Sequence, residues 1–197
     1  MEQDYTSLMI RDYDQLVKLP KEAYDLVIPN LILVNLKRGT VIKSQGQVDR
    51  VSRYLCEGFI GTYRFQDSEQ KLFTIYKKTD TVFDETSFRS GLPSETVLKS
   101  ISDVVFLEYS VDSESKLLQE HPSFTILAHK VAHRITERNS KVHSIAKLGL
   151  EKGYEILMKE FPGLEAHITN LDIGSFFGVS TRTAERWKHN LKGKGHD

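Results

Sequence analysis

Cysteine is almost absent from this sequence, which has one, Cys56, among 197 residues. A single thiol excludes an internal disulfide, an iron–sulfur cluster, and any structural zinc site that needs several thiolates from one chain. Histidine is absent from the first 120 residues, because all seven histidines lie at or beyond His121. The first half of the chain therefore has no histidine to hold a haem or the metal of a cupin-type enzyme.

Net charge and long apolar runs are also missing. Lys plus Arg and Asp plus Glu each number 27, so the formal net charge is zero and any surface that binds a polyanion must be local. No stretch approaches the roughly 18 apolar residues of a membrane helix. The acidic N-terminal segment does not resemble a signal peptide. We therefore expect a cytoplasmic protein that makes no membrane contact and fills its core with the 39% of residues that are hydrophobic.

The first half of the chain reads as β-structure. Short apolar runs rich in β-branched and aromatic residues, several of them alternating, are separated by glycines at positions where turns are needed. These runs are LILVNLKRGTVIKSQG, VSRYLCEGFIGTYRF, KLFTIYKK and VVFLEYS. Several strands at this spacing predict an antiparallel sandwich or barrel. Cys56 falls within one run and is interpreted as a buried strand cysteine.

From Ser113 onward the pattern becomes helical. A short helix with Asp112 or Ser113 as its cap is expected to stop at Pro122, and a long helix without Gly or Pro follows over 123–148. Residues spaced three or four apart form one stripe on that helix. This stripe either packs on its own domain or forms a homodimer seam. The helix length and the charged residues on its other faces favour the seam, made by Leu127, Val131, Ile135, Arg138, Val142 and Ile145.

Two further features of the helical half were weighed. His129 and His133 have the i, i+4 spacing of a metal-chelating pair, but no further ligands lie nearby in sequence, so no metal site is predicted. The segment LEKGYEILMKEF predicts a short helix that Gly153 interrupts and Pro162 and Gly163 end.

The segment 170–189, NLDIGSFFGVSTRTAERWKH, predicts a helix-turn-helix. Thr169 can cap the first helix, with Asp172 in its first turn. Gly178 can adopt the left-handed conformation that ends this helix, and Ser180 can cap the second helix. A small residue at Gly174 lets the two helices approach each other closely.

The outer face of the second helix suits contacts to base edges and phosphates in a major groove. From 180 to 197 there are five Lys or Arg against two acidic residues, so positive charge is local to this segment. The alternative is a helical hairpin with a solvated charged face. We favour binding to double-stranded DNA, through Thr169, Ser180, Thr181, Arg182, Thr183, Arg186, Lys188 and His189.

The whole chain resembles the Crp/Fnr family of bacterial transcription regulators. The resemblance rests mainly on ITNLDIGSFFGVSTRTAERWK and is supported by LKRGTVIKSQGQ, LCEGFIGTYRF and GLPSET; the last looks most like members common in Bacteroidetes. It implies an α+β fold: an N-terminal antiparallel β-roll (a jelly roll resembling cyclic-nucleotide-binding domains), a long dimerisation helix and a C-terminal helix-turn-helix domain. The corresponding domains are residues 1–121, 122–148 and 149–197.

The resemblance also implies a function. The chain would be a homodimeric regulator, not an enzyme, that binds a two-fold symmetric DNA site, with RNA polymerase as a further candidate partner. Carried over by position, Thr181, Arg182 and Arg186 would read bases, and Ser180, Thr183 and Lys188 would assist at phosphates. Only KGKGHD follows Leu191, so contacts from the β-hairpin wing common in the family are not predicted.

The sensor loop departs from the family pattern. Cyclic-nucleotide-binding relatives begin this loop with Gly-Glu and end it with Arg before Ser or Thr, because the arginine neutralises the cyclic phosphate. Here Asp84 occupies the glycine position, Glu85 is retained, and the arginine position falls on Ser94 or Glu95. Arg89 is the cation within the loop. No cofactor is predicted, and the residues of this degenerate effector pocket are Asp84, Glu85, Thr86, Arg89, Ser94, Glu95 and Thr96.

Two hypotheses of different classes remain. The first is a sequence-specific DNA-binding regulator with a degenerate sensor of unknown effector. The second is a small-molecule-binding module of the cyclic-nucleotide type whose C-terminal helices engage a protein partner.

Overall fold

The computed structural model describes residues 4–67 and 69–194. The strands are β1 (Ile32–Leu36), β2 (Val41–Lys43), β3 (Val51–Glu57), β4 (Ile60–Gln66), β5 (Glu69–Tyr76), β6 (Thr81–Val82), β7 (Thr96–Ser100) and β8 (Val104–Ser110). The helices are α1 (Tyr5–Leu16), α2 (Lys21–Tyr24), η1 (Ile28–Asn30), α3 (Glu85–Ser90), α4 (Val111–Glu120), α5 (Ser123–Lys147), α6 (Gly149–Glu160), η2 (Leu164–Ala166), α7 (Asn170–Phe177) and α8 (Thr181–Lys194).

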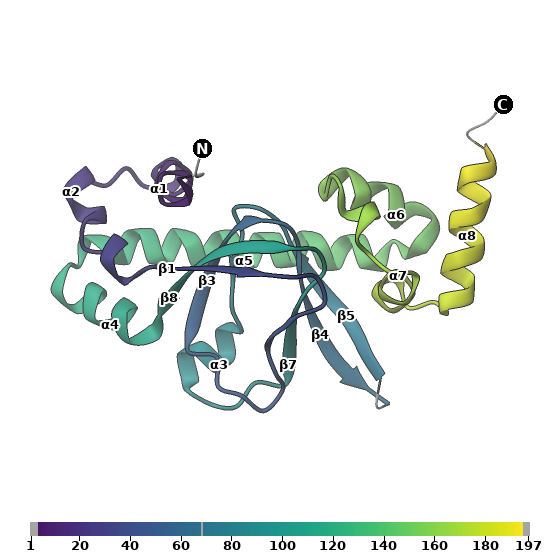
Figure 1. Ribbon diagram of the computed structural model, residues 1–197, viewed down its shortest axis with the longest axis horizontal. Coiled ribbons are helices and arrows are strands. Elements are labelled where there is room, and N and C mark those ends of the chain that lie inside the picture. Colours follow the sequence, from purple (N-terminus) through teal and green to yellow (C-terminus); the bar gives the residue numbers. More distant parts are fainter. Residues whose placement is uncertain (1–3, 68, 195–197) are drawn as a thin grey trace.

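The strands form the β-roll that the sequence predicts. Two antiparallel sheets, with strand orders β1-β8-β3-β6 and β2-β7-β4-β5, enclose an apolar core that includes Leu55, Ile60, Val82 and Phe106. Helices α1, α2 and α4 lie at one end of the roll, and α6, α7 and α8 lie at the other (Figure 1). The predicted α+β architecture is therefore confirmed, whereas the domain boundaries at 121/122 and 148/149 stay predictions.

Strand β3 shows how the first sheet separates two environments. Successive side chains of a strand point to opposite faces. Leu55 faces the interior of the roll, whereas Tyr54 and Cys56 face the cluster formed with α1, α4 and α5. Burial raises the pKa of the Cys56 thiol to about 12, so this cysteine is held as a neutral thiol, as its interpretation as a buried strand residue requires.

Several sequence-level expectations for the helices are corrected. The cap of α4 is Ser110, whose Oγ accepts from the Ser113 amide at 3.1 Å, and neither Asp112 nor Ser113 has this role. Helix α6 runs unbroken through Gly153. This glycine marks a close approach, because a Cβ there would lie 2.5 Å from Cε1 of Phe177. Helix α1 and strand β7 were not predicted.

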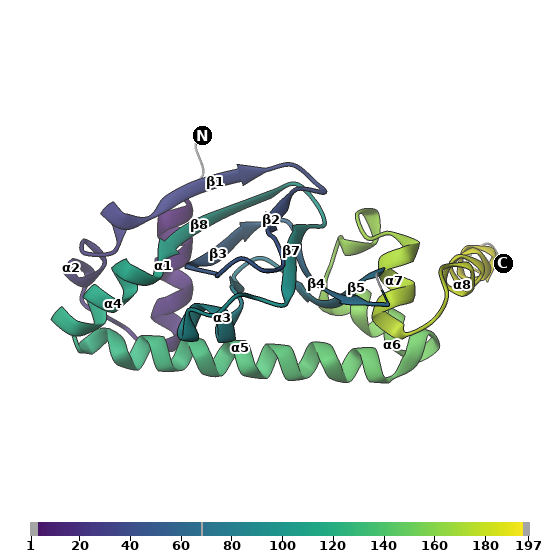
Figure 2. The same ribbon diagram turned by 90° about the horizontal axis from the view of Figure 1, so that it is seen from below.

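Helix α5 has the predicted length and runs along the roll to the C-terminal helices (Figure 2). Its stripe is buried within the chain. Leu127 packs in the cluster with α1, and Val142 and Ile145 pack in the cluster with α6 and α7. Ile135 is also buried, and the half-buried Val131 packs beside Leu127. The expected dimer seam is therefore occupied within one protomer, and the alternative reading, packing on its own domain, holds for these residues.

Arg138 shows why a charged residue fits that stripe. Its Nη1 donates to the Ile75 carbonyl at 2.6 Å, and its guanidinium lies 3.8 Å from the centre of the Tyr76 ring. Arg138 therefore ties α5 to strand β5. Among the residues that the structure describes, no helix is both long and apolar enough to span a bilayer.

Candidate functional site

The C-terminal segment folds as two helices joined by a tight turn. Thr169 and Asp172 form a capping box at the start of α7, with the Thr169 Oγ1 accepting from the Asp172 amide at 3.0 Å. Gly178 ends α7 in the left-handed conformation at φ 69°, as predicted. The Ser180 Oγ then accepts from the Thr183 amide at 3.1 Å, which caps α8. The local sequence therefore sets both ends of the turn.

Close packing fixes the angle between these helices. Ala184 of α8 is fully buried, and a Cβ on Gly174 would lie 2.8 Å from the Val179 carbonyl oxygen. Trp187 packs edge-on against Tyr154 of α6, with ring centres 4.8 Å apart. These contacts bury one face of α8 in the core, so the opposite face of the helix is exposed to solvent.

Gly174→Ala is expected to destabilise this pair of helices. The new methyl group meets a backbone oxygen of the turn, which can move only if the helices separate. Overpacking of this kind costs about 1–3 kcal/mol, more than the ~1 kcal/mol that alanine gains over glycine in a helix. The midpoint of chemical unfolding measures the loss. Asn190→Ala, at an exposed position of α8, is the control; equal stability of the two variants would contradict the close approach.

The predicted DNA-binding residues differ in exposure. Thr169, Ser180, Arg182, Arg186 and His189 are exposed, whereas Thr181, Thr183 and Lys188 are half-buried. Thr169, Ser180 and Thr183 also serve as caps or as partners of caps. The exposed Arg182 and Arg186 lie one helical turn apart and so share a face of α8. Helix α8 continues to Lys194, the last described residue.

Ion pairs hold the C-terminal helices against the roll. Glu160 of α6 accepts from Lys77, just after β5, at 2.9 Å, and lies 2.5 Å from the Lys141 ammonium of α5. In addition, the Ser175 Oγ of α7 accepts from the Leu72 amide of β5 at 3.0 Å. Glu160 is the one residue of this set that touches both the sensor roll and the long helix.

Glu160→Gln is expected to lower stability at neutral pH by about 1 kcal/mol or less, because the pair is partly exposed. Burial opposes ionisation, but hydrogen bonds from Lys141 and Lys77 outweigh it and lower the pKa of Glu160 below its ordinary 4.5. A carboxyl group with a depressed pKa stabilises the fold above that ordinary value, and this contribution fades as pH falls through the folded-state pKa. The gap in Tm between wild type and variant should therefore close below pH 4.5. A gap independent of pH would contradict the charged pairing.

The sensor loop forms a self-contained polar network. Asp84 caps α3, and its Oδ2 accepts from the Ser94 Oγ at 2.5 Å and the Thr96 Oγ1 at 3.0 Å. Burial opposes the charge on Asp84. Hydrogen bonds from Ser94, the Ser87 amide and Thr96, together with the charge of Lys43, nevertheless lower its pKa. Asp84 is thus held as a carboxylate by the loop's own donors.

Lys43 is the site residue that sequence reasoning missed. It lies on β2, is 3% exposed, and its Nζ donates to Ser94 and to the Thr96 carbonyl, 3.9 Å from the Asp84 carboxylate. Burial lowers the pKa of Lys43, and Asp84 partly offsets this. The cation expected of a phosphate site is therefore present, but it comes from a distant strand and is already neutralised. The signal available in the sequence was a lysine within the three-residue strand VIK. Its burial could not be recognised without the register of that strand with its neighbour.

A second buried pair lies beside the first. Arg53 of β3 donates from Nη1 to the Asp49 carboxylate at 3.1 Å and from Nε to Glu108 at 3.2 Å. Asp49 also accepts from the Asp84 amide at 2.8 Å, and its own amide donates to the Ser87 Oγ at 2.9 Å. The start of α3 is thereby bound to β3, and the polar interior of the roll is occupied by the chain's own side chains.

The other candidate effector residues lie outside this network. Glu85, Thr86 and Glu95 are exposed. Arg89 pairs with Glu114 of α4 at 2.7 Å and faces away from Asp84 and Lys43 towards the helices. The structure therefore groups Asp84, Ser94 and Thr96 with Lys43 and separates them from Arg89.

The histidine pair on α5 makes no visible metal centre. His129 and His133 are exposed, and His133 lies 3.4 Å from Glu137. Within residues 4–67 and 69–194, no group of three or more His, Cys, Asp or Glu side chains is placed to hold a metal ion.

Solved structures of transcription regulators share this fold. The c-di-GMP-responsive global regulator CLP of Xanthomonas campestris has a TM-score of 0.69 at 14% identity, over 89% of this chain and 93% of that one. A crp/fnr-family regulator from Eubacterium rectale has the same TM-score and identity, over 90% and 85%. DNR from Pseudomonas aeruginosa has a TM-score of 0.57 at 17% identity, over 99% and 91%. No family model and no curated protein matches the sequence.

Proposed function

We propose that this chain, which has the fold of the Crp/Fnr transcription regulators, is a non-enzymatic regulator that binds specific DNA sequences as a homodimer. The observation that carries the proposal is the α7–α8 pair. Its inward face is fixed by Ala184 and Trp187, and its outward face presents Arg182 and Arg186. Arginine is the side chain that most often reads guanine in the major groove, by donating to O6 and N7.

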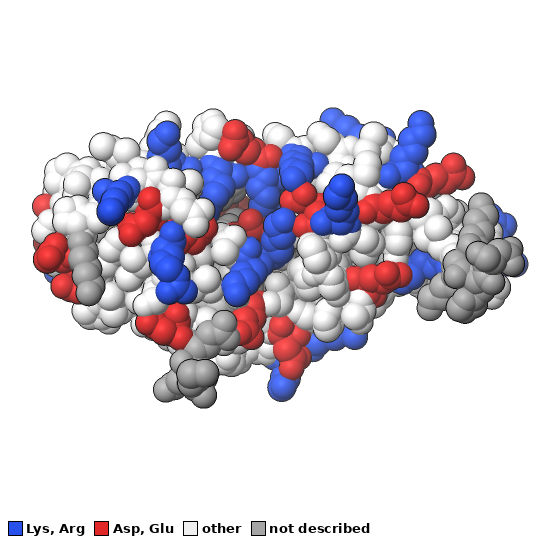
Figure 3. All heavy atoms as spheres, turned by 90° about the horizontal axis from the view of Figure 1, so that it is seen from above, with Lys and Arg blue, Asp and Glu red and all other residues white. Residues whose placement is uncertain are grey.

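The charge distribution supports a local contact. On the face shown in Figure 3, Lys and Arg side chains are interspersed with Asp and Glu side chains. This agrees with a net charge of zero, whereas the sequence after residue 180 has an excess of cations. Affinity should therefore come from α8 and its surroundings rather than from a broad basic field.

The proposed dimer uses a face of α5 other than the expected stripe. That stripe is buried in the chain, whereas Ile126, 59% exposed, and the exposed His129 and His133 follow one another at helical spacing on a different face. We propose that the two protomers meet along this face.

The sensor is proposed to be degenerate toward cyclic nucleotides. Lys43 and Asp84 neutralise each other at the position where relatives hold a phosphate, so an incoming anion would have to displace an internal carboxylate. Calorimetric titration with cyclic AMP is expected to give no binding heat. A micromolar Kd would contradict this part of the proposal and leave the DNA-binding part standing.

Selection of bound DNA from a random pool tests the proposal. The expected result is an enriched two-fold symmetric motif whose half-sites are about 34–36 Å, or a multiple of that, apart. The affinity should fall steeply with salt, because each phosphate contact releases counterions. A pool without any enriched sequence would overturn the proposal and favour a protein partner for the C-terminal helices.

A further inference from the structure

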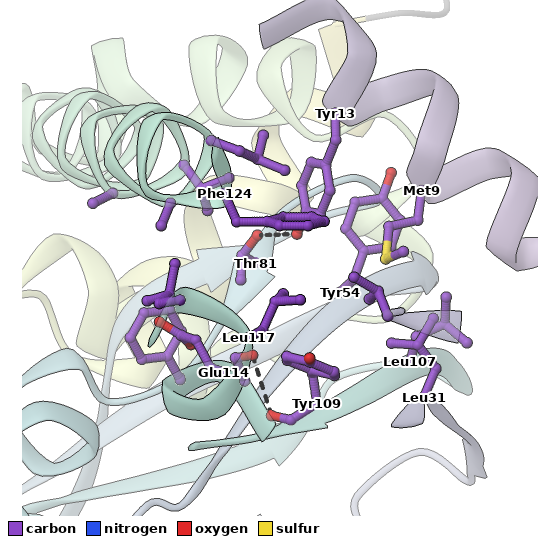
Figure 4. Close-up of a pocket in the computed structure, with 18 of the residues that line it drawn as sticks. Met9, Tyr13, Leu31, Tyr54, Thr81, Leu107, Tyr109, Glu114, Leu117 and Phe124 are labelled. Carbon is purple, nitrogen blue, oxygen red and sulfur yellow. Dashed lines mark hydrogen bonds between the residues drawn. The ribbon is translucent and has the colours of Figure 1, made fainter. Parts of the chain in front are cut away.

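A cavity of about 120 Å³ lies outside the roll, between the first sheet and the helices that cover it. Strands β3 and β8 supply Tyr54 and Leu107, α1 supplies Met9 and Tyr13, and α5 supplies Phe124. Figure 4 shows Tyr13 and Phe124 on one side of this cavity and Leu117 and Tyr109 on the other. The cavity is therefore walled by the N-terminal helices, the first sheet and the long helix α5.

This cavity is separate from the Asp84–Lys43 network. Tyr54 and Leu107 belong to the apolar cluster on the outer face of the sheet, whereas their strand neighbours Leu55 and Phe106 belong to the core inside the roll. Because neighbouring residues of a strand point to opposite faces, the sheet itself lies between the two sites.

The chemistry of the walls is aromatic and aliphatic. The rings of Tyr13 and Tyr54 meet edge-on at 5.3 Å, and the aromatic lining is completed by Tyr24, Phe83, Tyr109 and Phe124. Aromatic rings favour edge-on or offset contacts with further rings. A planar ring is thus the shape that these walls accept best.

Most polar groups at the cavity are engaged with one another, whereas the buried Tyr54 hydroxyl has no hydrogen-bond partner among the described residues. Arg89 pairs with Glu114 at 2.7 Å, and the Tyr13 hydroxyl lies 3.2 Å from the Thr81 Oγ1. A charged ligand would have to break the Arg89–Glu114 pair, whereas an uncharged apolar ligand leaves these contacts in place. At about 120 Å³ the cavity is somewhat smaller than the dry apolar cavity of roughly 150 Å³ that holds benzene, so its size limits a ligand to one small ring.

We propose that this cavity is a binding site for small uncharged aromatic compounds of a single ring. Ligand and walls meet through apolar contact, and the site requires no rearrangement of the buried charges inside the roll. The proposal concerns binding alone and stands whether or not the chain binds DNA.

Benzene is the probe that we would use, with thermal unfolding of the full chain as the readout. A ligand that binds only the folded state raises the Tm of the protein, by roughly 3–11 °C when present at about ten to a hundred times its Kd. Ala128 and Ala132 of α5 line the cavity, so Ala128→Leu or Ala132→Leu places a side chain where the ring would lie. Ala166→Leu makes the same change at an exposed position in η2 and is the matched control.

The proposal expects benzene to raise the Tm of the wild type and of Ala166→Leu equally, and the Tm of the two filled variants at least fivefold less. If one filled variant fails to fold, the other supplies the comparison. Either of two results would overturn the proposal: no benzene-dependent rise in the Tm of the wild type, or a rise of the same size in a folded, filled variant.

Discussion

Arg186→Ala is expected to weaken binding to the selected operator by about 10- to 100-fold for each half-site, because a good base contact is worth roughly 1–3 kcal/mol. In a symmetric dimer the contact is lost in both half-sites. The total loss of operator affinity is therefore the product of the two half-site factors. Arg186 is exposed on α8 and makes no ion pair within the described residues. Fluorescence anisotropy at fixed salt, with operator and scrambled DNA, measures the effect.

The fold should not suffer from this change. Tm is expected to stay within about 2 °C of the wild type, because exposed substitutions rarely exceed ~0.5 kcal/mol. Arg11→Ala, an exposed arginine of α1 far from α8, is the matched control and should keep full operator affinity. Equal operator affinity for Arg186→Ala and Arg11→Ala would remove α8 as the reading helix.

Asp49→Ala should cause the largest loss of stability, about 3–5 kcal/mol, because it breaks a buried ion pair from one side. Asp49 is 1% exposed and Arg53 is 5% exposed. Without the carboxylate, the Arg53 guanidinium keeps only Glu108 as a charged partner, and the Asp84 amide loses its acceptor. The effect should reach α3 as well as β3, because Asp49 joins them. Urea unfolding, followed by circular dichroism, measures the change.

Asp112→Ala is the matched control for this loss. Its carboxylate pairs with Arg50 at 2.8 Å, but 79% of the Asp112 side chain is exposed, so removing it should cost no more than about 1 kcal/mol. Both variants replace an aspartate by alanine, one in a buried ion pair and the other in an exposed ion pair. A similar loss of stability in both variants would show that the interior pair does not hold the loop.

The parts of this protein that were predictable are those with strong local patterns. Thr169, Gly174 and Gly178 specify a capped helix, a close approach and a helix end within ten residues, and the structure has all three. The long helix was equally clear, because no Gly or Pro interrupts residues 123–147. The partner of its apolar stripe was not clear, because a periodic stripe shows that a face is buried and not what buries it.

The loop of residues 84–96 shows the limit of what local sequence patterns can predict. The stretch DETSFRSGLPSET has no glycine at position 84 and no arginine at position 94 or 95, where the resemblance places those of a phosphate cassette. It could not show Lys43, which lies 41 residues before Asp84 in the sequence. Lys43 reaches Ser94 and Thr96 through the register of β2 with β7. The cavity beside Tyr54 was invisible for the same reason, because α1, β8 and α5 meet only in three dimensions. By itself the sequence determined the capped ends of α7 and α8, the long helix α5 and the strand-forming runs of the first half, since these depend on neighbours along the chain. The tertiary structure alone decided which buried charges pair, which face of α5 stays free and where a cavity remains, because each depends on contacts between distant segments.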